Sequence, residues 1–362
     1  MMKDERSNLS KLTIVMTTYR RQDYALRNMH YWSNTEVILL VLDGSEQPIE
    51  KNLLESFGNN IIYRHDPVPA NNRIEGAFSF INTKYAVLIA DDEFYIPSAV
   101  TSCIKELDQD DTIIACSGCC LGFRVDKKAD KIYGFIAYNQ LINYNETMNH
   151  NSVKRLNGHM TNYVPSLIYG ITRSEVWKNA YKLIAKKKFD FYAADEVQIE
   201  MYVSFAGKSK ILKELMWLRS TGENLPIRVE HLDQAEPELL IREWWDFDKK
   251  QRMEFIKIMS DAFRNTNPNI NLNYDEIVIS AYNSHIQRSK NLKISKYKIF
   301  TNCIKYLIPN KLKHFIIKYL KLRNVKKFSF LDAASLIKNY GVKVDYEELI
   351  KIKKIIEKFH KK

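Results

Sequence analysis

Residues 85–97 read YAVLIADDEFYIP, an apolar run that leads directly into three consecutive acids. The run VLIA at 87–90 has the composition of a buried strand, and Asp91, Asp92 and Glu93 follow it at once. A strand that ends in carboxylates puts negative charge at the carboxyl edge of a sheet, where open α/β sheets bind their ligands. The stretch therefore predicts an α/β fold with a ligand site at this edge.

The same acids predict a bound cation. Like charges that are packed together repel each other, so a positive group should balance them. Mg²⁺ is usually held by one or two carboxylates together with substrate phosphate oxygens. We therefore expect a divalent metal (Mg²⁺ or Mn²⁺) that is shared with a diphosphate. A solvated acidic turn before a helix beginning at Pro97 is the simpler alternative.

The segments before this stretch are typical of a parallel nucleotide-binding sheet. Apolar runs at 12–16, 36–42 and 61–64 alternate with a helical segment near 24–32, and the second run ends at Asp43. No glycine-rich phosphate loop follows the first run. This absence counts against a dinucleotide dehydrogenase and against a P-loop NTPase.

These motifs resemble those of family 2 glycosyltransferases with a GT-A fold, and most of all a bacterial and archaeal surface-polysaccharide subgroup whose metal motif is ADD-acid-F. TYRR at 18–21 resembles the family's opening TYNR, and DGS at 43–45 resembles the motif after its second strand. ADD at 90–92 falls at its Asp-x-Asp metal motif. Asp195 and Glu196 resemble its acid pair, and Gly207 follows Glu196 at the family spacing. The resemblance covers roughly residues 12–225.

The resemblance implies a GT-A domain, which is a Rossmann-like, mostly parallel sheet flanked by helices. It implies a metal-dependent, inverting glycosyltransferase that uses a nucleotide-sugar, which we expect to be UDP-linked. The acceptor would be a saccharide or a lipid-linked saccharide in the synthesis of a cell-surface polysaccharide such as capsule or O-antigen. We expect a cytoplasmic enzyme, with a peripheral position on the inner face of the membrane as a further option.

The resemblance also assigns residues to the donor site. Asp43 would accept a hydrogen bond from a uracil-like base, with Thr18 and Tyr19 lining the same pocket. Arg21 and Arg73 are candidate partners of the diphosphate. Each has a simpler interpretation as well, since Asp-Gly is a common turn and an arginine is usually solvated.

Two departures from the family pattern affect the expected site. Ala90 stands where the first acid of Asp-x-Asp is expected, so the metal should rest on Asp92, helped by Asp91 or Glu93. The acid pair is reversed, so register favours Glu196 as the catalytic base and residue type favours Asp195. The family's arginine six positions after the base is replaced by Tyr202.

A general base is the chemistry that the acid pair would supply. Transfer to a hydroxyl group requires a carboxylate within hydrogen-bonding reach of that hydroxyl to take its proton. Acids in the first turn of a helix are also favourable without any catalytic role. Both interpretations apply to Asp195 and Glu196, because we expect a helix at 195–206.

Length and composition fit a globular protein with one large domain and an extension. The chain has 362 residues, of which 45% are hydrophobic, and no stretch reaches the roughly 18 apolar residues of a spanning helix. We expect the catalytic domain at 1–230 and a helical extension at 231–362. Within the domain we expect acceptor loops at 127–162, and strands and helices elsewhere. The cysteines at 116–120 should be buried thiols rather than a zinc site.

The formal net charge of +12 comes largely from the extension. No acid occurs between Glu276 and Asp332, and a helix at 310–323 would carry an apolar face flanked by lysines. Such a helix is suited to an anionic membrane surface, although packing on the domain with solvated lysines is an equal alternative. Nucleic-acid binding is the weakest of the three interpretations, and the sequence does not predict an oligomeric state.

Two other functional classes remain as alternatives. A nucleotidyltransferase would share the sheet and its acidic metal site, but it usually begins with a glycine-rich loop. A non-enzymatic basic adaptor on a membrane or nucleic acid would need neither Asp92 nor the acids at 195–196. Donor turnover by an Asp92→Ala variant separates these classes.

Overall fold

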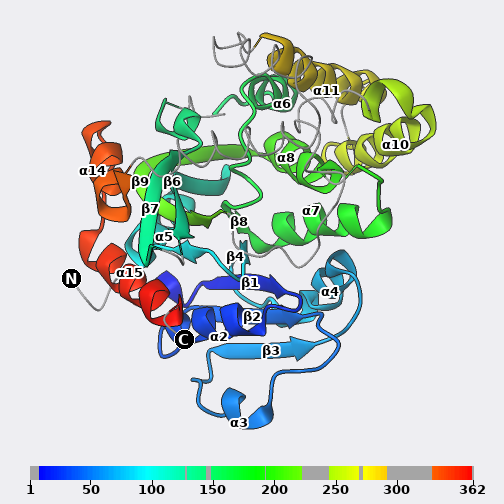
Figure 1. Ribbon diagram of the computed structural model, residues 1–362. Helices are drawn as coiled ribbons and strands as arrows, with labels where there is room; N and C mark the ends of the chain where they lie inside the picture. Colours follow the sequence, from blue (N-terminus) through cyan, green and yellow to red (C-terminus); the bar gives the residue numbers. More distant parts are fainter. Residues whose placement is uncertain are drawn as a thin grey trace, which may run out of the picture.

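The computed structural model describes residues 8–126, 129–143, 148–191, 193–221, 244–268, 272–291 and 328–360. Its first half is a parallel sheet with the strand order β3-β2-β1-β4 (Figure 1). These strands are β1 (Leu12–Thr18), β2 (Ile38–Asp43), β3 (Ile61–His65) and β4 (Tyr85–Ala90). The apolar runs at 12–16, 36–42 and 61–64 and the run at 87–90 therefore form the expected strands.

The register of these strands brings their carboxyl ends together. Thr18 at the end of β1 pairs with Asp43 at the end of β2, and Thr17 pairs with Ala90 at the end of β4. The polar residues that follow the strands therefore meet at one edge of the sheet. The connecting elements are α2 (Gln22–Trp32), α3 (Lys51–Leu54), α4 (Ala70–Gly76), the 3-10 turn η1 (Phe78–Phe80) and α5 (Pro97–Gln109).

The second half of the sheet is mixed. β8 (Ile171–Arg173) runs antiparallel to β4, and β6 (Ile113–Asp126) runs antiparallel to β8. β9 (Lys208–Ser220) is parallel to β6 and pairs antiparallel with β5 (Phe94–Tyr95), while β7 (Lys131–Ala137) is antiparallel to β6. The predicted α/β fold is confirmed and is consistent with the GT-A type, but the sheet is mixed rather than mostly parallel, because every described pairing in its second half except that of β6 with β9 is antiparallel.

One local expectation is corrected. The segment 127–162 was expected to be loops, but its described part contains β7, the 3-10 helix η2 (Asn139–Asn143) and α6 (Ser152–Thr161). After β8, α7 (Ser174–Lys186) begins at Ser174, whose hydroxyl donates to the carbonyl of Thr83. The helix expected at 195–206 is α8 (Ala194–Ala206).

Part of the extension packs on the catalytic domain. α10 (Lys249–Thr266) and α11 (Tyr274–Asn291) pack near α8 and α6 (Figure 1). Trp244 and Trp245 are buried there. β10 (Phe328–Ser329) adds to β7, α14 (Phe330–Asn339) packs on β7, and α15 (Tyr346–His360) packs on α2. The domain boundary at 230 stays a prediction.

The helix predicted at 310–323 lies outside the described residues, as does the membrane contact proposed for it. Within the described ranges, no helix is both long enough and apolar enough to cross a membrane.

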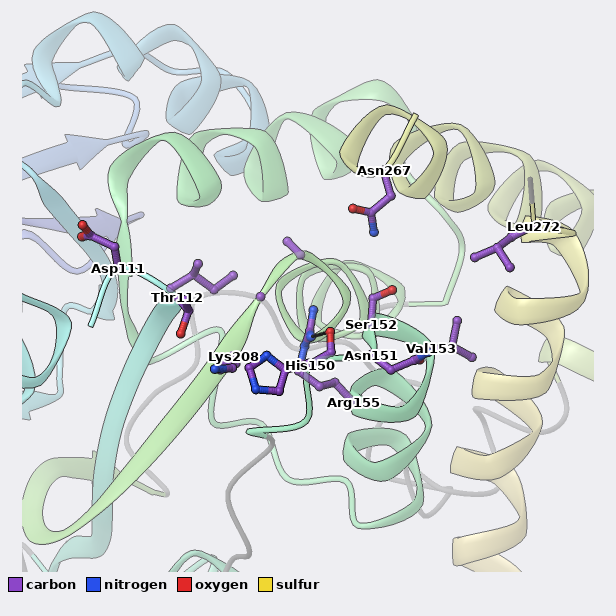
Figure 2. A pocket seen from close by; sticks show the side chains of 13 residues that line it. Asp111, Thr112, His150, Asn151, Ser152, Val153, Arg155, Lys208, Asn267 and Leu272 are labelled. Atoms are coloured by element: carbon purple, nitrogen blue, oxygen red, sulfur yellow. Dashed lines mark hydrogen bonds between the residues drawn. The ribbon is translucent and has the colours of Figure 1, made fainter. Parts of the chain in front are cut away.

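A cavity of about 600 Å³ opens where α8 ends, β6 begins and α6 begins (Figure 2). His150, Asn151 and Ser152 line it from the start of α6, and Lys208 lines it from the start of β9. The guanidinium of Arg155 also lies at this cavity and donates to the carbonyls of Asn149, His150, Ser204 and Phe205. These bonds tie α6 to the end of α8.

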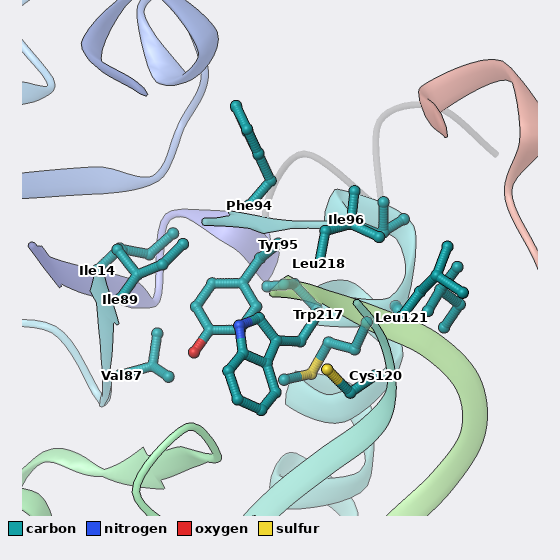
Figure 3. Close-up of a cluster of buried hydrophobic side chains, with 14 of the residues drawn as sticks. Ile14, Val87, Ile89, Phe94, Tyr95, Ile96, Cys120, Leu121, Trp217 and Leu218 are labelled. Carbon is teal, nitrogen blue, oxygen red and sulfur yellow. The ribbon is translucent and has the colours of Figure 1, made fainter. Parts of the chain in front are cut away.

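Alternate residues of the central strands enter two hydrophobic cores, one on each face of the sheet. In β1, Ile14 and Met16 face one core and Val15 faces the other. The first core also holds Tyr95 and Trp217, and the cysteines of β6 are buried in it or at its margin (Figure 3). This confirms the prediction that the cysteines at 116–120 are buried thiols.

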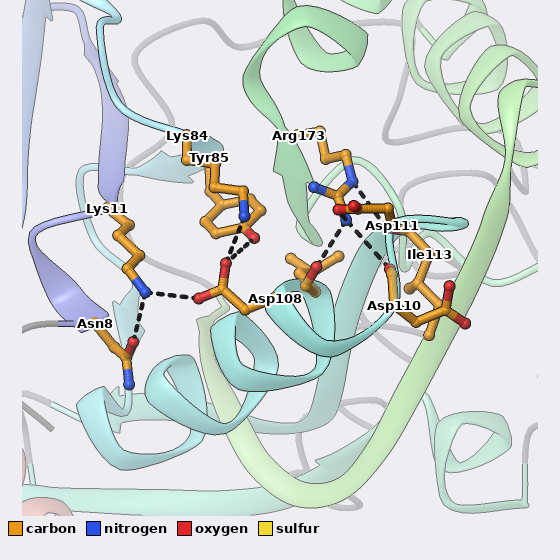
Figure 4. A network of polar contacts seen from close by, with 10 residues as sticks. Asn8, Lys11, Lys84, Tyr85, Asp108, Asp110, Asp111, Ile113 and Arg173 are labelled. Atoms are coloured by element: carbon orange, nitrogen blue, oxygen red, sulfur yellow. Dashed lines mark hydrogen bonds and ion pairs between the residues drawn. The ribbon is translucent and has the colours of Figure 1, made fainter. Parts of the chain in front are cut away.

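Asp108 at the end of α5 fastens the amino ends of β1 and β4. Its carboxylate accepts hydrogen bonds from the ammonium groups of Lys11 and Lys84 and from the hydroxyl of Tyr85 (Figure 4). Nearby, the guanidinium of Arg173 donates to carbonyls at the end of α5 and the start of β6. These bonds fix the edge of the sheet opposite the polar strand ends.

Candidate functional site

The acids after β4 meet an arginine from the start of α2. The guanidinium of Arg21 lies 3.3 Å from the carboxylate of Asp91 and 2.7 Å from that of Asp92. The hydroxyl of Thr18 donates to Asp91 at 2.8 Å. Thr18, Arg21 and Asp91, all predicted donor-site residues, therefore lie together with Asp92. The guanidinium of Arg21 is the positive group that was expected to balance the acids.

Asp91 and Asp92 differ in accessibility. Asp91 is buried, and this burial raises the pKa of its carboxyl to about 7, while the charge of Arg21 opposes the rise and that of Asp92 adds to it. The side chain of Asp92 keeps 13% of its surface exposed against 5% for Asp91. Asp92 is therefore the acid that a ligand at the sheet edge can reach.

Glu93 points away from this edge. Its carboxyl accepts a hydrogen bond of 2.8 Å from the indole Nε1 of Trp217 and lies 4.0 Å from the guanidinium of Arg219. Burial, together with the charge of Asp92, raises its pKa to about 8. This geometry departs from the expectation that Glu93 helps Asp92 to hold a metal, because the carboxyl is engaged in the core beside β9.

The described residues fit a divalent metal only through Asp92. They contain no group of three or more His, Cys, Asp or Glu side chains that could hold an ion. A magnesium site commonly uses one or two carboxylates and completes its shell with substrate phosphates and water. Asp92 meets this requirement when a diphosphate supplies the remaining oxygens, so metal binding stays a prediction that depends on the donor.

Asp43 is fully buried and supports the loop after β2. Its Oδ2 accepts hydrogen bonds from Gln22 at 2.6 Å and from the hydroxyl of Tyr63 at 2.7 Å, and its Oδ1 accepts one from the amide of Ser45 at 2.8 Å. The pKa of Asp43 is lowered because these bonds to the carboxylate outweigh burial. A nucleotide base reaches this carboxylate only if neighbouring side chains move.

Tyr19, expected at the base pocket, and Arg73, expected at the diphosphate, both lie around Asp43. The guanidinium of Arg73, on α4, donates to the carbonyl of Val68 at 3.0 Å and packs on Gly44, where an added Cβ would lie 1.1 Å from its Nη1. Tyr19 is partly exposed, and its hydroxyl donates to Glu46 at 3.2 Å. Arg73 therefore packs against Gly44, next to Asp43, and among the residues that the structure describes it is not an ion-pair partner of Asp91 or Asp92.

The acid pair opens α8, and its two members have different partners. The amide of Asn71, on α4, donates to Asp195 at 2.8 Å. The hydroxyl of Tyr163, in the segment before β8, donates to Glu196 at 2.6 Å. Burial raises the pKa of both acids. The pKa of Glu196 reaches about 7, because the hydrogen bond from Tyr163 offsets only part of the effect of burial.

Tyr169 connects the strand-end acids with the acid pair. Its ring stacks on Trp217, the partner of Glu93, at a centroid distance of 4.0 Å. Its pKa is raised well above the usual value by burial and then by the charges of Glu93 and Glu196. The end of β4 and the start of α8 therefore flank the same partly exposed tyrosine.

Several residues of this site carry no sequence signal of their own. Tyr163 and Asn71 lie in unremarkable polar segments, and Glu200 reads as an ordinary helix residue. The i to i+4 spacing of Glu196 and Glu200 is a weak hint that both acids lie on one face of α8. The cavity in Figure 2 lies at the other end of α8, about 16 Å along the helix from Glu196.

Comparisons with known proteins give distant structural likenesses only. No protein-family model matches the chain, and no curated protein matches it. Similar solved structures include S. aureus TarS, which is 11% identical over 77% of this chain with a TM-score of 0.39. This chain spans 55% of that one.

Residues 1–349 of S. aureus TarS have also been solved with ligands. The complex with UDP is 9% identical, with 79% of this chain and 92% of that chain covered and a TM-score of 0.40. The complex with UDP-GlcNAc is 10% identical, with 77% and 90% covered and a TM-score of 0.40. At this level of likeness, function has to be argued from the residues of this chain.

Proposed function

We propose that the chain is an inverting glycosyltransferase that moves a sugar from a nucleotide-sugar, UDP-linked by preference, to a hydroxyl of a saccharide acceptor. The observation that carries the proposal is the partly exposed carboxylate of Glu196, whose pKa burial raises to about 7 and which lies near Tyr169, as Glu93 after β4 also does. The setting, synthesis of a cell-surface polysaccharide, follows from the sequence resemblance.

Glu196 has the properties of a general base. A base works best when its pKa lies near the working pH, and the burial of Glu196 brings it there. One carboxylate oxygen, Oε1, accepts the hydrogen bond from Tyr163. The other oxygen is then the one to take a proton from the acceptor hydroxyl.

The donor would bind along the edge formed by Thr18, Arg21 and Asp92. Arg21 supplies a guanidinium for the diphosphate, since such a group matches phosphate geometry in two parallel hydrogen bonds. Asp92 would hold the divalent metal, which neutralises charge on the leaving diphosphate when it is bound. A base on the face opposite the leaving group implies a single displacement with inversion at the anomeric carbon.

The first test is donor binding by an Asp92→Asn variant. The amide keeps the shape of the side chain and removes its charge, so we expect the affinity for UDP in the presence of Mg²⁺ or Mn²⁺ to fall about tenfold or more. Calorimetric titration with metal and with EDTA measures this. The metal proposal is wrong if the affinity is the same in both conditions for both proteins.

A second test concerns Arg73, whose guanidinium packs on Gly44 beside Asp43. A methyl group at Gly44 would displace the guanidinium of Arg73, which is the end of a flexible side chain, so stability should change little. We expect Gly44→Ala to weaken UDP binding by about tenfold, the worth of one charge-assisted hydrogen bond. Gly76→Ala is the matched control, because no atom lies within 4 Å of its added Cβ. Equal UDP affinity in the two variants would remove Arg73 from the donor site.

A further inference from the structure

We propose that Tyr163 is a positioning residue that holds the carboxylate of Glu196 in its catalytic orientation and keeps it ionised at neutral pH. This inference rests on the proposed function, since it describes how the base is prepared. It is carried by the 2.6 Å hydrogen bond from the Tyr163 hydroxyl to Glu196 and by the way the protein fixes both ends of the segment that contains Tyr163.

Glu200 anchors that segment one helical turn after the base. Its Oε1 accepts hydrogen bonds from the backbone amides of Leu167 at 2.9 Å and Ile168 at 2.8 Å. Its Oε2 lies 2.6 Å from the Nε2 of His159, and both side chains are fully buried. The segment from His159 to Ile168 is thereby tied to α8 at both ends, with Tyr163 between them and directed at Glu196.

A helix of the extension supports the ring of Tyr163. The imidazole of His285, on α11, lies 4.1 Å from the ring of Tyr163 between centroids, and the ring of His159 lies 6.0 Å away on α6. Tyr163 and His285 are both 7% exposed. The tyrosine therefore has little freedom to leave Glu196 while α11 is packed against it.

The titratable groups around Glu196 make the hydrogen bond from Tyr163 important. On α8 itself, Asp195 is the neighbour in sequence and the charge of Glu200 disfavours ionisation of Glu196. Tyr169 faces Glu196 from the segment before β8, and His159, Tyr282 and His285 lie around Tyr163. Within the described part of the chain, the hydroxyl of Tyr163 is thus the group that favours the ionised carboxylate against burial.

The test is the pH dependence of kcat/KM for a Tyr163→Phe variant. The ring stays and the hydrogen bond is lost, so the charged form of Glu196 is less favoured and its pKa rises. We expect the acidic limb of the profile to move up by about one to two pH units, the worth of a hydrogen bond to a charged group, with donor KM unchanged and activity recovering at high pH.

Tyr181→Phe is the matched control, because this buried tyrosine lies near Glu200 and its hydroxyl contacts the carbonyl of Ile168 rather than Glu196. Its acidic limb should stay in place. An acidic limb that stays in place in Tyr163→Phe, whatever the overall activity, would overturn the proposal that this hydroxyl keeps Glu196 ionised.

A second measurement separates this inference from the proposed function. Carbon-13 NMR titration of the Glu196 carboxyl, assigned by its loss in Glu196→Gln, reports the pKa without any turnover. An upward shift in Tyr163→Phe supports the role of Tyr163 even if no nucleotide-sugar is used, and an unchanged pKa refutes it. Absence of turnover in the native protein with every nucleotide-sugar would count against the proposed function alone.

Discussion

Replacement of Glu196 by glutamine should lower kcat by about 10²–10⁴-fold and leave the affinity for the donor unchanged. The amide can still accept the hydrogen bond from Tyr163, so the shape of the site is kept, but it cannot take a proton. Steady-state turnover and calorimetric donor binding, measured on the same preparation, separate the loss of chemistry from the loss of binding.

Asp195→Asn is the matched comparison, because it makes the same change one residue earlier. Asp195 is held by Asn71 from α4, which suits a role in joining α8 to the donor half. We expect a smaller effect on kcat than for Glu196→Gln. The opposite order would make Asp195 the base, and near-native turnover in both variants would exclude the acid pair from catalysis.

The largest effect on stability is expected for Glu200→Ala. The substitution takes away the carboxylate that accepts from the buried amide of Leu167 and the partly buried amide of Ile168 and that pairs with the imidazole of His159. Each buried group left without an acceptor costs roughly 1–3 kcal/mol. We therefore expect the free energy of unfolding, measured by urea titration with circular dichroism, to fall by about 3–5 kcal/mol.

Glu175→Ala provides the control for Glu200→Ala. Glu175 pairs with Lys178 on the surface of α7, and its side chain is 83% exposed. Its replacement should change the free energy of unfolding by about 0.5 kcal/mol or less. If Glu200→Ala were equally mild, the clamp on the 159–168 segment would not be a stabilising feature.

The sequence was a good guide to the sheet and to the residues at its edge. Buried parallel strands need continuous apolar runs, so β1, β2 and β4 could be located, and their polar endings had to meet once the strands were parallel. The start of α8 could also be predicted from the sequence, because Asp195 and Glu196 come just before the apolar residues of this helix.

What could not be predicted depends on side-chain direction and on distant partners. Asp92 and Glu93 are adjacent in sequence, but one faces the sheet edge and the other the indole of Trp217, 124 residues away. The partner of Glu196 lies 33 residues before it in a segment with no motif. The packing of α11 and α15 on the domain likewise follows from surfaces that a linear pattern does not reveal.

The most direct test of a base at Glu196 opposite a leaving diphosphate is the anomeric configuration of the product. Proton NMR of the glycoside made by the native protein from a single α-linked nucleotide-sugar gives this configuration from the coupling of the anomeric proton. We expect a β-linked product, with the same configuration in the small amount formed by Glu196→Gln. An α-linked product would mean retention and would contradict a single displacement assisted by Glu196.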